Sequence, residues 1–174
     1  MTRKIFSRPF TQQEAISQEA IDAATEVLKT GRLHRYNTIE DELSQVSLLE
    51  QEYASYQGGR YCLACTSCGY ALSISLKAAG LESGDYVLTN TYTLAPVPGA
   101  ISNAGGKAIF VEINENLVLD LDDLAQKATS SGARFLLLSH MRGHIVDMNE
   151  LIRIVHEKNL ILIEDCAHTM GAKW

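Results

Sequence analysis

The chain has 174 residues, of which 46% are hydrophobic and 21% charged, as is usual for a globular protein with one buried core. The formal net charge of −6 argues against binding nucleic acid or an anionic membrane, since either would need a basic patch. No apolar run approaches the roughly 20 residues of a membrane span, and no apolar stretch of a signal peptide follows the basic start. Four cysteines do not make a disulfide scaffold, so we expect a cytoplasmic protein with reduced thiols.

Residues 1–58 are predicted to form an N-terminal helical part. The sequence Thr-Gln-Gln-Glu at 11–14 fits a capping box, and the helix that it opens would end at Gly31. A second helix is predicted over 43–56, because apolar side chains recur there every three or four residues and Gly58 follows.

Residues 59–174 alternate between short apolar segments and helical patterns. This alternation predicts an α/β fold with a mainly parallel sheet flanked by helices, and near-continuous apolar runs such as Phe-Leu-Leu-Leu suit strands that are covered on both faces. The predicted strands are 61–65, 86–89, 107–111, 135–139 and 160–164. The predicted helices are 67–79, 121–128 behind an Asp120 cap, 148–158, and a turn into a helix capped by Thr93.

Ligands of such folds bind beyond the carboxyl ends of the strands, and two segments there carry candidate site residues. Ser67, Cys68 and Gly69 open a predicted helix, where backbone N–H groups and the helix dipole favour an anion such as phosphate. An ordinary serine cap explains the same residues. Asp165 ends the last apolar strand, where a carboxylate either needs a cationic partner or caps the following turn.

Two patterns have the spacing of metal ligands, but simpler explanations are preferred for both. The His-x3-His spacing at 140–144 needs a continuous helix, which Gly143 disfavours. Cysteines at 62, 65 and 68 are similar to part of an iron–sulfur or zinc run, but no fourth cysteine follows. We therefore predict core and turn thiols and no metal site.

Taken in order, six segments resemble the DegT-type aminotransferases. This family belongs to the fold-type-I enzymes, depends on pyridoxal 5'-phosphate (PLP) and modifies nucleotide-linked keto-sugars. The segments are Gly31-Arg32, Ser67-Cys68-Gly69-Tyr70-Ala71-Leu72, Gly84-Asp85-Tyr86-Val87-Leu88, Val111-Glu112-Ile113 with Leu119-Asp120, His140-Met141-Arg142-Gly143, and Glu164-Asp165-Cys166-Ala167-His168 with Gly171-Ala172. The resemblance implies the large domain of a PLP-dependent transferase and the activity of an aminotransferase in sugar biosynthesis.

The resemblance implies two catalytic residues, which would also bind the cofactor. Asp165 would pair with the pyridine nitrogen of PLP and make the ring an electron sink. His168 stands where the family usually has a glutamine, near the ring hydroxyl. The change from glutamine alters the charge balance but keeps a hydrogen-bonding group at this position.

The resemblance also implies how the rest of the cofactor would be held. Cys68 and Gly69 would offer backbone N–H groups to the phosphate, together with Ser67. Gly69 lacks the hydroxyl of the threonine that is usual in the family. Leu94 stands where an aromatic side chain usually stacks on the ring, so it would give an apolar wall without stacking.

In the family, the lysine that holds PLP covalently lies beyond the position of Gly171, and none of the seven lysines of this chain matches it. The resemblance thus implies that residues 1–174 are the N-terminal part of the enzyme, an incomplete PLP-binding large domain without the small C-terminal domain, and inactive alone. Three possibilities stay open: a piece of a longer enzyme or a shortened reading frame, one half of a split enzyme, and a non-catalytic PLP- or nucleotide-binding α/β module. The complete enzyme would use a small-molecule amino donor and a keto-sugar, and would form a homo-oligomer or pair with a complementing C-terminal chain.

Overall fold

The computed structural model describes residues 13–40 and 42–173, which divide into two compact units, Met1–Ala64 and Cys65–Trp174. The first unit contains helices α1 (Gln18–Thr30) and α2 (Gln45–Gln57). Gly31 and Gly58 end these helices in the left-handed conformation, as the sequence predicts.

The capping-box prediction for α1 is wrong. Ser17 caps the helix instead, because its hydroxyl accepts the N–H of Ala20 at 3.2 Å, and positions 13–14 precede the helix. Positions 11 and 12 lie outside the described residues. Serine is one of the preferred caps, and the start of α1 follows from its position.

Polar contacts link separate segments of the first unit. No described residue of α1 or α2 is buried. Arg35 donates two hydrogen bonds to the carboxylate of Glu50, at 2.8 and 2.6 Å, and the N–H of Ala64 donates a third at 2.7 Å. These contacts, with that of Arg35 first, lower the pKa of Glu50 from its ordinary value of 4.5.

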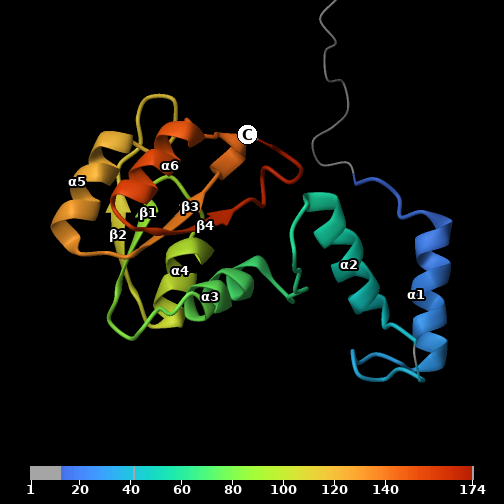
Figure 1. Ribbon diagram of the computed structural model, residues 1–174. Coiled ribbons are helices and arrows are strands. Elements are labelled where there is room, and N and C mark those ends of the chain that lie inside the picture. The colour runs from blue at the N-terminus through green and yellow to red at the C-terminus, as the bar shows by residue number, and fades with distance from the viewer. Residues whose placement is uncertain (1–12, 41, 174) are drawn as a thin grey trace, which may run out of the picture. The chain divides into compact units, whose positions relative to one another are not determined.

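The second unit is built on a four-stranded parallel sheet (Figure 1). Its strands are β1 (Tyr86–Asn90), β2 (Lys107–Val111), β3 (Phe135–Ser139) and β4 (Ile161–Asp165), in the order β2-β1-β3-β4. The chain moves outward from β1 to β2 and then returns to the other side of β1 to form β3. The order therefore reverses between β1 and β3, which is where ligands of doubly wound sheets bind.

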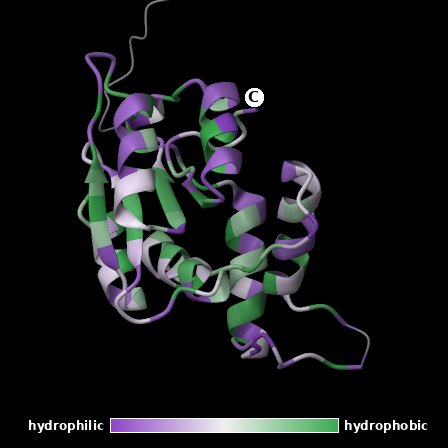
Figure 2. Ribbon diagram, turned by 60° about the vertical axis from the view of Figure 1, so that its left-hand side comes forward, coloured by the Kyte–Doolittle hydropathy of each residue, from purple (hydrophilic) through white to green (hydrophobic). Residues whose placement is uncertain are grey.

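Helices cover both faces of this sheet (Figure 1). Helices α3 (Cys68–Ala78) and α4 (Pro96–Ala104) pack on one face, and α5 (Leu121–Ser131) and α6 (Met148–Glu157) pack on the other. A hydrophobic core lies on each face, and successive strand residues point to opposite faces. Phe135 and Leu137 thus pack in the core under α3 and α4, and Leu136 and Leu138 in the core under α5 and α6. Figure 2 shows the strands largely in the green of hydrophobic residues. The predicted α/β class is confirmed.

In the second unit and at its entry, the boundaries of the elements follow the predictions closely, with two exceptions. The predicted strand at 61–65 does not form, and none of the described strands pairs with this segment. Thr93 does not cap α4: the residue at the cap is Ala95, with no side-chain cap bond, and the Thr93 hydroxyl is buried without a partner in the described part of the chain. No helix among the described residues is long and apolar enough to span a membrane.

Candidate functional site

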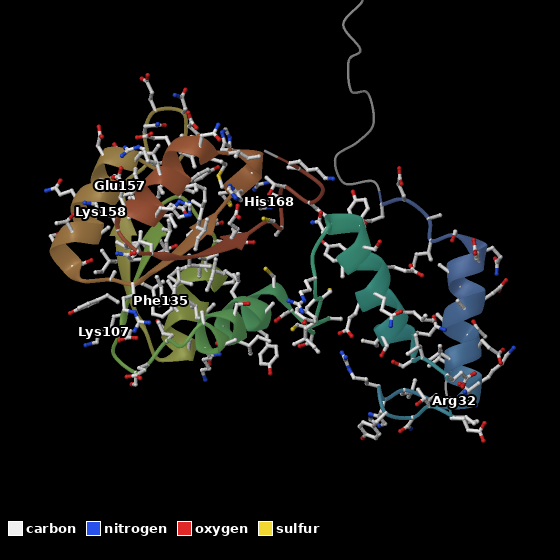
Figure 3. All side chains as sticks on the ribbon, viewed as in Figure 1. Arg32, Lys107, Phe135, Glu157, Lys158 and His168 are labelled. Carbon is white, nitrogen blue, oxygen red and sulfur yellow. The ribbon has the colours of Figure 1, made fainter. Side chains whose placement is uncertain are left out.

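The carboxyl ends of the parallel strands gather polar residues at one edge of the sheet. Asn90 ends β1, Ser139 ends β3 and Asp165 ends β4. Figure 3 labels Lys107 and Phe135 at the amino ends of β2 and β3, with His168 beyond the opposite end of the sheet. This edge of the sheet is therefore the candidate site.

Asn90 fixes β1 to β3 where the order of the strands reverses. Its side chain is 3% exposed. Its Oδ1 accepts the N–H of Ser139 at 2.9 Å, and its Nδ2 donates to the carbonyls of Ser139 and Tyr92 at 3.1 and 2.7 Å. The β1–β3 ladder stops one residue earlier, at Thr89, so one side chain continues the pairing of the two strands and sets the position of Ser139.

The carboxylate of Asp165 is held by three donors. The Ser139 hydroxyl donates to Oδ2 at 3.1 Å, and the N–H of Ala167 donates to Oδ1 at 3.2 Å. The Cys68 thiol also donates to Oδ1, at 3.7 Å. Burial, and then the negative charge of Asp165, raise the pKa of the Cys68 thiol, so this thiol stays a donor. The carboxylate is only partly buried and remains open to a ligand.

The start of α3 lies against this carboxylate through Cys68. The Ser67 hydroxyl accepts the N–H of Tyr70 at 3.2 Å, and its carbonyl accepts that of Ala71 at 3.0 Å. The N–H groups of Cys68 and Gly69, like those at any helix start, have no intrahelical acceptor and can bind an anion. A side chain added at Gly69 would meet only Pro96, at an ordinary 3.8 Å from the new Cβ.

His168 lies on the exposed segment after β4 (Figure 3). Its Nδ1 accepts the backbone N–H of Arg142 at 3.1 Å. Arg142 belongs to the short 3-10 helix Met141–Gly143 that follows β3 and has a positive φ of 57°. An Nδ1 that accepts leaves the proton of the neutral imidazole on Nε2, so His168 presents an Nε2–H donor.

Leu94 lies in the loop between β1 and α4 and is 50% exposed. The loop follows the carboxyl end of β1, which places Leu94 at the same edge of the sheet as Asp165. Among the predicted cofactor-binding residues, Cys68 forms a hydrogen bond with Asp165. His168 forms its hydrogen bond with Arg142, in the turn after β3, and not with Asp165.

Two residues of the site, Asn90 and Ser139, do not figure in the sequence-based prediction. Asn90 directly follows one predicted apolar strand and Ser139 ends another, which is the same signal that singled out Asp165. The two histidines of the His-x3-His pattern have different partners: Nε2 of His140 lies 2.9 Å from Oε2 of Glu164, whereas the ring of His144 lies edge-on to that of Tyr92.

Comparison with known proteins gives both relatives and a shared fold. The spore coat polysaccharide biosynthesis protein SpsC of Bacillus subtilis is 29% identical over 156 residues, 89% of this chain and 38% of SpsC. The dTDP-3-amino-3,4,6-trideoxy-alpha-D-glucose transaminase of Micromonospora megalomicea subsp. nigra is 29% identical over 155 residues, 89% of this chain and 40% of the enzyme. The PLP form of the putative sugar aminotransferase Spr1654 from Streptococcus pneumoniae has the same fold, with a TM-score of 0.81 and 19% identity over 95% of this chain and 44% of that one.

The chain thus spans about two fifths of the length of the relatives that it matches. The sequence pattern of one family matches residues 14–174, which is nearly the whole chain. The chain belongs to the DegT/DnrJ/EryC1/StrS aminotransferase family.

Proposed function

We propose that this chain forms the PLP-binding part of an aminotransferase that acts on a nucleotide-linked keto-sugar. The observation that carries the proposal is the contact between the start of α3, at Cys68, and the carboxylate of Asp165. The two groups that the ends of PLP need, an anion site and a carboxylate, therefore lie at one edge of the sheet. The activity is proposed for the whole protein, because this chain covers only 38% of the length of a relative such as SpsC.

The residues present fit PLP in charge and in hydrogen-bonding capacity. The N–H groups of Cys68 and Gly69, with the Ser67 hydroxyl beside them, suit a phosphate at a helix start. Asp165 suits a protonated pyridine nitrogen, because it is an ionisable carboxylate that already accepts three hydrogen bonds and is still partly exposed. When bound, PLP supplies an electron sink for carbanion chemistry.

The side chains around the proposed cofactor have separate tasks. Asp165 keeps a proton on the ring nitrogen, and the Ser139 hydroxyl and the Cys68 thiol hold its carboxylate in place. His168 would donate its Nε2–H to the ring oxygen, because its Nδ1 already accepts the N–H of Arg142. Leu94 gives an apolar wall that excludes water from the ring. An imidazole N–H would thus take over the donor role that a glutamine amide has elsewhere in the family.

The remaining parts of the proposal concern the whole protein. We propose that the covalent lysine lies in another segment of it, because none of the seven lysines of this chain matches the position of that lysine in the family. Two of them, Lys107 at the amino end of β2 and Lys127 bound to Asp123, are also away from the candidate site or already paired. Residues 1–174 would be the incomplete large domain, and the small C-terminal domain would lie elsewhere in the protein. The proposed keto-sugar substrate follows the names of relatives such as the dTDP-amino-sugar transaminase. We further propose a small-molecule amino donor, a homo-oligomer or a complementing C-terminal chain, and a location in the cytoplasm.

Equilibrium dialysis of the chain against PLP tests the cofactor site. We expect saturable binding, and a loss of about 10–100-fold in affinity for Asp165→Asn, since a hydrogen bond to a charged group contributes about 1.5–3 kcal/mol. Asp122→Asn, the same change on the exposed face of α5, is the matched control and should bind PLP normally. Equal affinity of the wild type and Asp165→Asn would refute the assignment of Asp165.

The reaction is tested with the whole protein, or with this chain co-expressed with its complementing segment. Amino-sugar product from a nucleotide-linked keto-sugar and glutamate supports aminotransfer. PLP binding with no product from any amino donor would overturn the activity and favour a non-catalytic module.

A further inference from the structure

Neighbouring residues at the ends of β3 and β4 face opposite sides of the sheet. Ser139 and Asp165 are paired in register, as are Leu138 and Glu164. Ser139 and Asp165 are joined to each other and to the start of α3. Since strand side chains alternate, Glu164 faces the α5–α6 side, and His140, the first residue after β3, meets its carboxylate there. The same alternation is seen earlier in β4, where Ile163 packs against the α3–α4 core and Leu162 against the other.

A second cluster of donor atoms forms on that side. The Nε2 of His140 lies 2.9 Å from Oε2 of Glu164. A ring nitrogen of His140, a carboxylate oxygen of Glu164 and the thiol of Cys166 all lie within 4.8 Å of one another. His140 is 4% exposed, whereas the Glu164 side chain is 29% exposed and Cys166 is exposed. The core therefore holds His140 in place, whereas the side chains of Glu164 and Cys166 have room to move.

We propose that His140, Glu164 and Cys166 bind a zinc-like divalent cation, in a site separate from the one proposed for PLP. Imidazole, carboxylate and thiolate are the donors that zinc takes in proteins. The thiolate disfavours magnesium and calcium, which prefer oxygen ligands. One thiolate and one carboxylate neutralise the two charges of the ion, so the loaded cluster holds no net charge beside the core.

The geometry needs only small adjustments. Bonds of about 2.0–2.3 Å in a tetrahedron place the donor atoms roughly 3.3–3.7 Å apart. His140 and Glu164 must separate from 2.9 Å by less than an ångström. The sulfur of the exposed Cys166 already lies within 4.8 Å of both, so it has at most about 1.5 Å to move. Three protein ligands leave a fourth position for water. The partly exposed Glu164 and the exposed Cys166 give the ion access from solvent. Binding displaces the proton of the thiol.

Titration of the reduced chain with Co²⁺ tests the proposal, because cobalt replaces zinc and a thiolate bound to cobalt gives a charge-transfer absorption band. We expect one saturable site per chain with this band, and its displacement by Zn²⁺. Cys166→Ser should abolish the band. Cys68→Ser, which removes a thiol on the α3 side, should keep it. Absence of the band in the wild type, or its persistence in Cys166→Ser, would overturn the proposal.

Two further variants separate metal binding from folding and from the cofactor. His140→Gln removes a buried ring and can fail to fold, so Glu164→Gln, which keeps a hydrogen bond to His140, is the second ligand variant. It should lose more cobalt affinity than the roughly 10–100-fold that an outer-shell change costs. Asp165→Asn should bind cobalt as the wild type does while losing PLP. A Glu164→Gln variant that binds cobalt normally, or an Asp165→Asn variant that loses cobalt, would contradict a separate three-residue site.

Discussion

Replacing Asn90 by alanine should destabilise the second unit strongly. The change removes three hydrogen bonds, to the N–H and carbonyl of Ser139 and to the carbonyl of Tyr92. Each contributes about 0.5–1.5 kcal/mol, and buried groups left without partners cost more. The expected loss is therefore about 2–4 kcal/mol, out of a total free energy of unfolding of roughly 5–15 kcal/mol for ordinary proteins.

Urea unfolding followed by circular dichroism measures this loss. The midpoint should fall while the slope with denaturant stays constant. Asn90→Asp separates the hydrogen bonds from side-chain volume: it keeps the acceptor for the Ser139 N–H but brings a carboxylate oxygen against two carbonyls, so it should be at least as unstable at neutral pH. Asn149→Ala on the exposed start of α6 is the control, within about 0.5 kcal/mol of the wild type. A loss below about 1 kcal/mol for Asn90→Ala would refute the reasoning.

Three other measurements follow from the structure. Gly69→Thr restores the hydroxyl usual in the family at a position with room for it, and should tighten PLP binding in dialysis about tenfold, since that is the effect of roughly 1.4 kcal/mol; unchanged or weaker binding would count against a phosphate at α3. Because the pKa of Glu50 is lowered from 4.5, chiefly by Arg35, its stabilisation is present above pH 4.5 and is lost as the pH falls through the lowered value. Glu50→Gln should therefore flatten the acid dependence of helix content, and parallel curves would contradict this. Burial and the charge of Asp165 raise the pKa of the Cys68 thiol, so Asp165→Asn should speed alkylation of Cys68 by iodoacetamide, measured by mass spectrometry; an unchanged rate would show that the carboxylate does not act on the thiol.

The sequence alone predicts those strands of the sheet whose positions are determined by the hydrophobic pattern. The runs at 107–111 and 135–139 are strands with the predicted bounds. The second is buried along its whole length, and a strand covered on both faces must be apolar throughout. Positions 61–65 are also rich in apolar residues, but Tyr61 and Leu63 are largely exposed. A strand needs a hydrogen-bonded neighbour, and no local pattern shows whether one exists.

The site could be predicted only in part for a related reason. Asp165 and the start of α3 stand out locally, as an acid after an apolar strand and as small residues before a helix. The link from Ser139 to Asp165 depends on β3 and β4 being neighbours in register, and no pattern within either strand states this. Two predicted helix starts, at 11–14 and at Thr93, were wrong. In each case the helix begins a few residues later, after Ser17 and after Ala95.

The register of β3 and β4 also limits how this part of the chain can change. One residue inserted or deleted within β4 would turn Glu164 instead of Asp165 toward α3, because each strand position reverses its face. The same shift would move Cys166 away from His140, so both groups of polar residues would be lost together. Insertions and deletions among homologous chains should therefore occur in the connecting loops and not within these two strands.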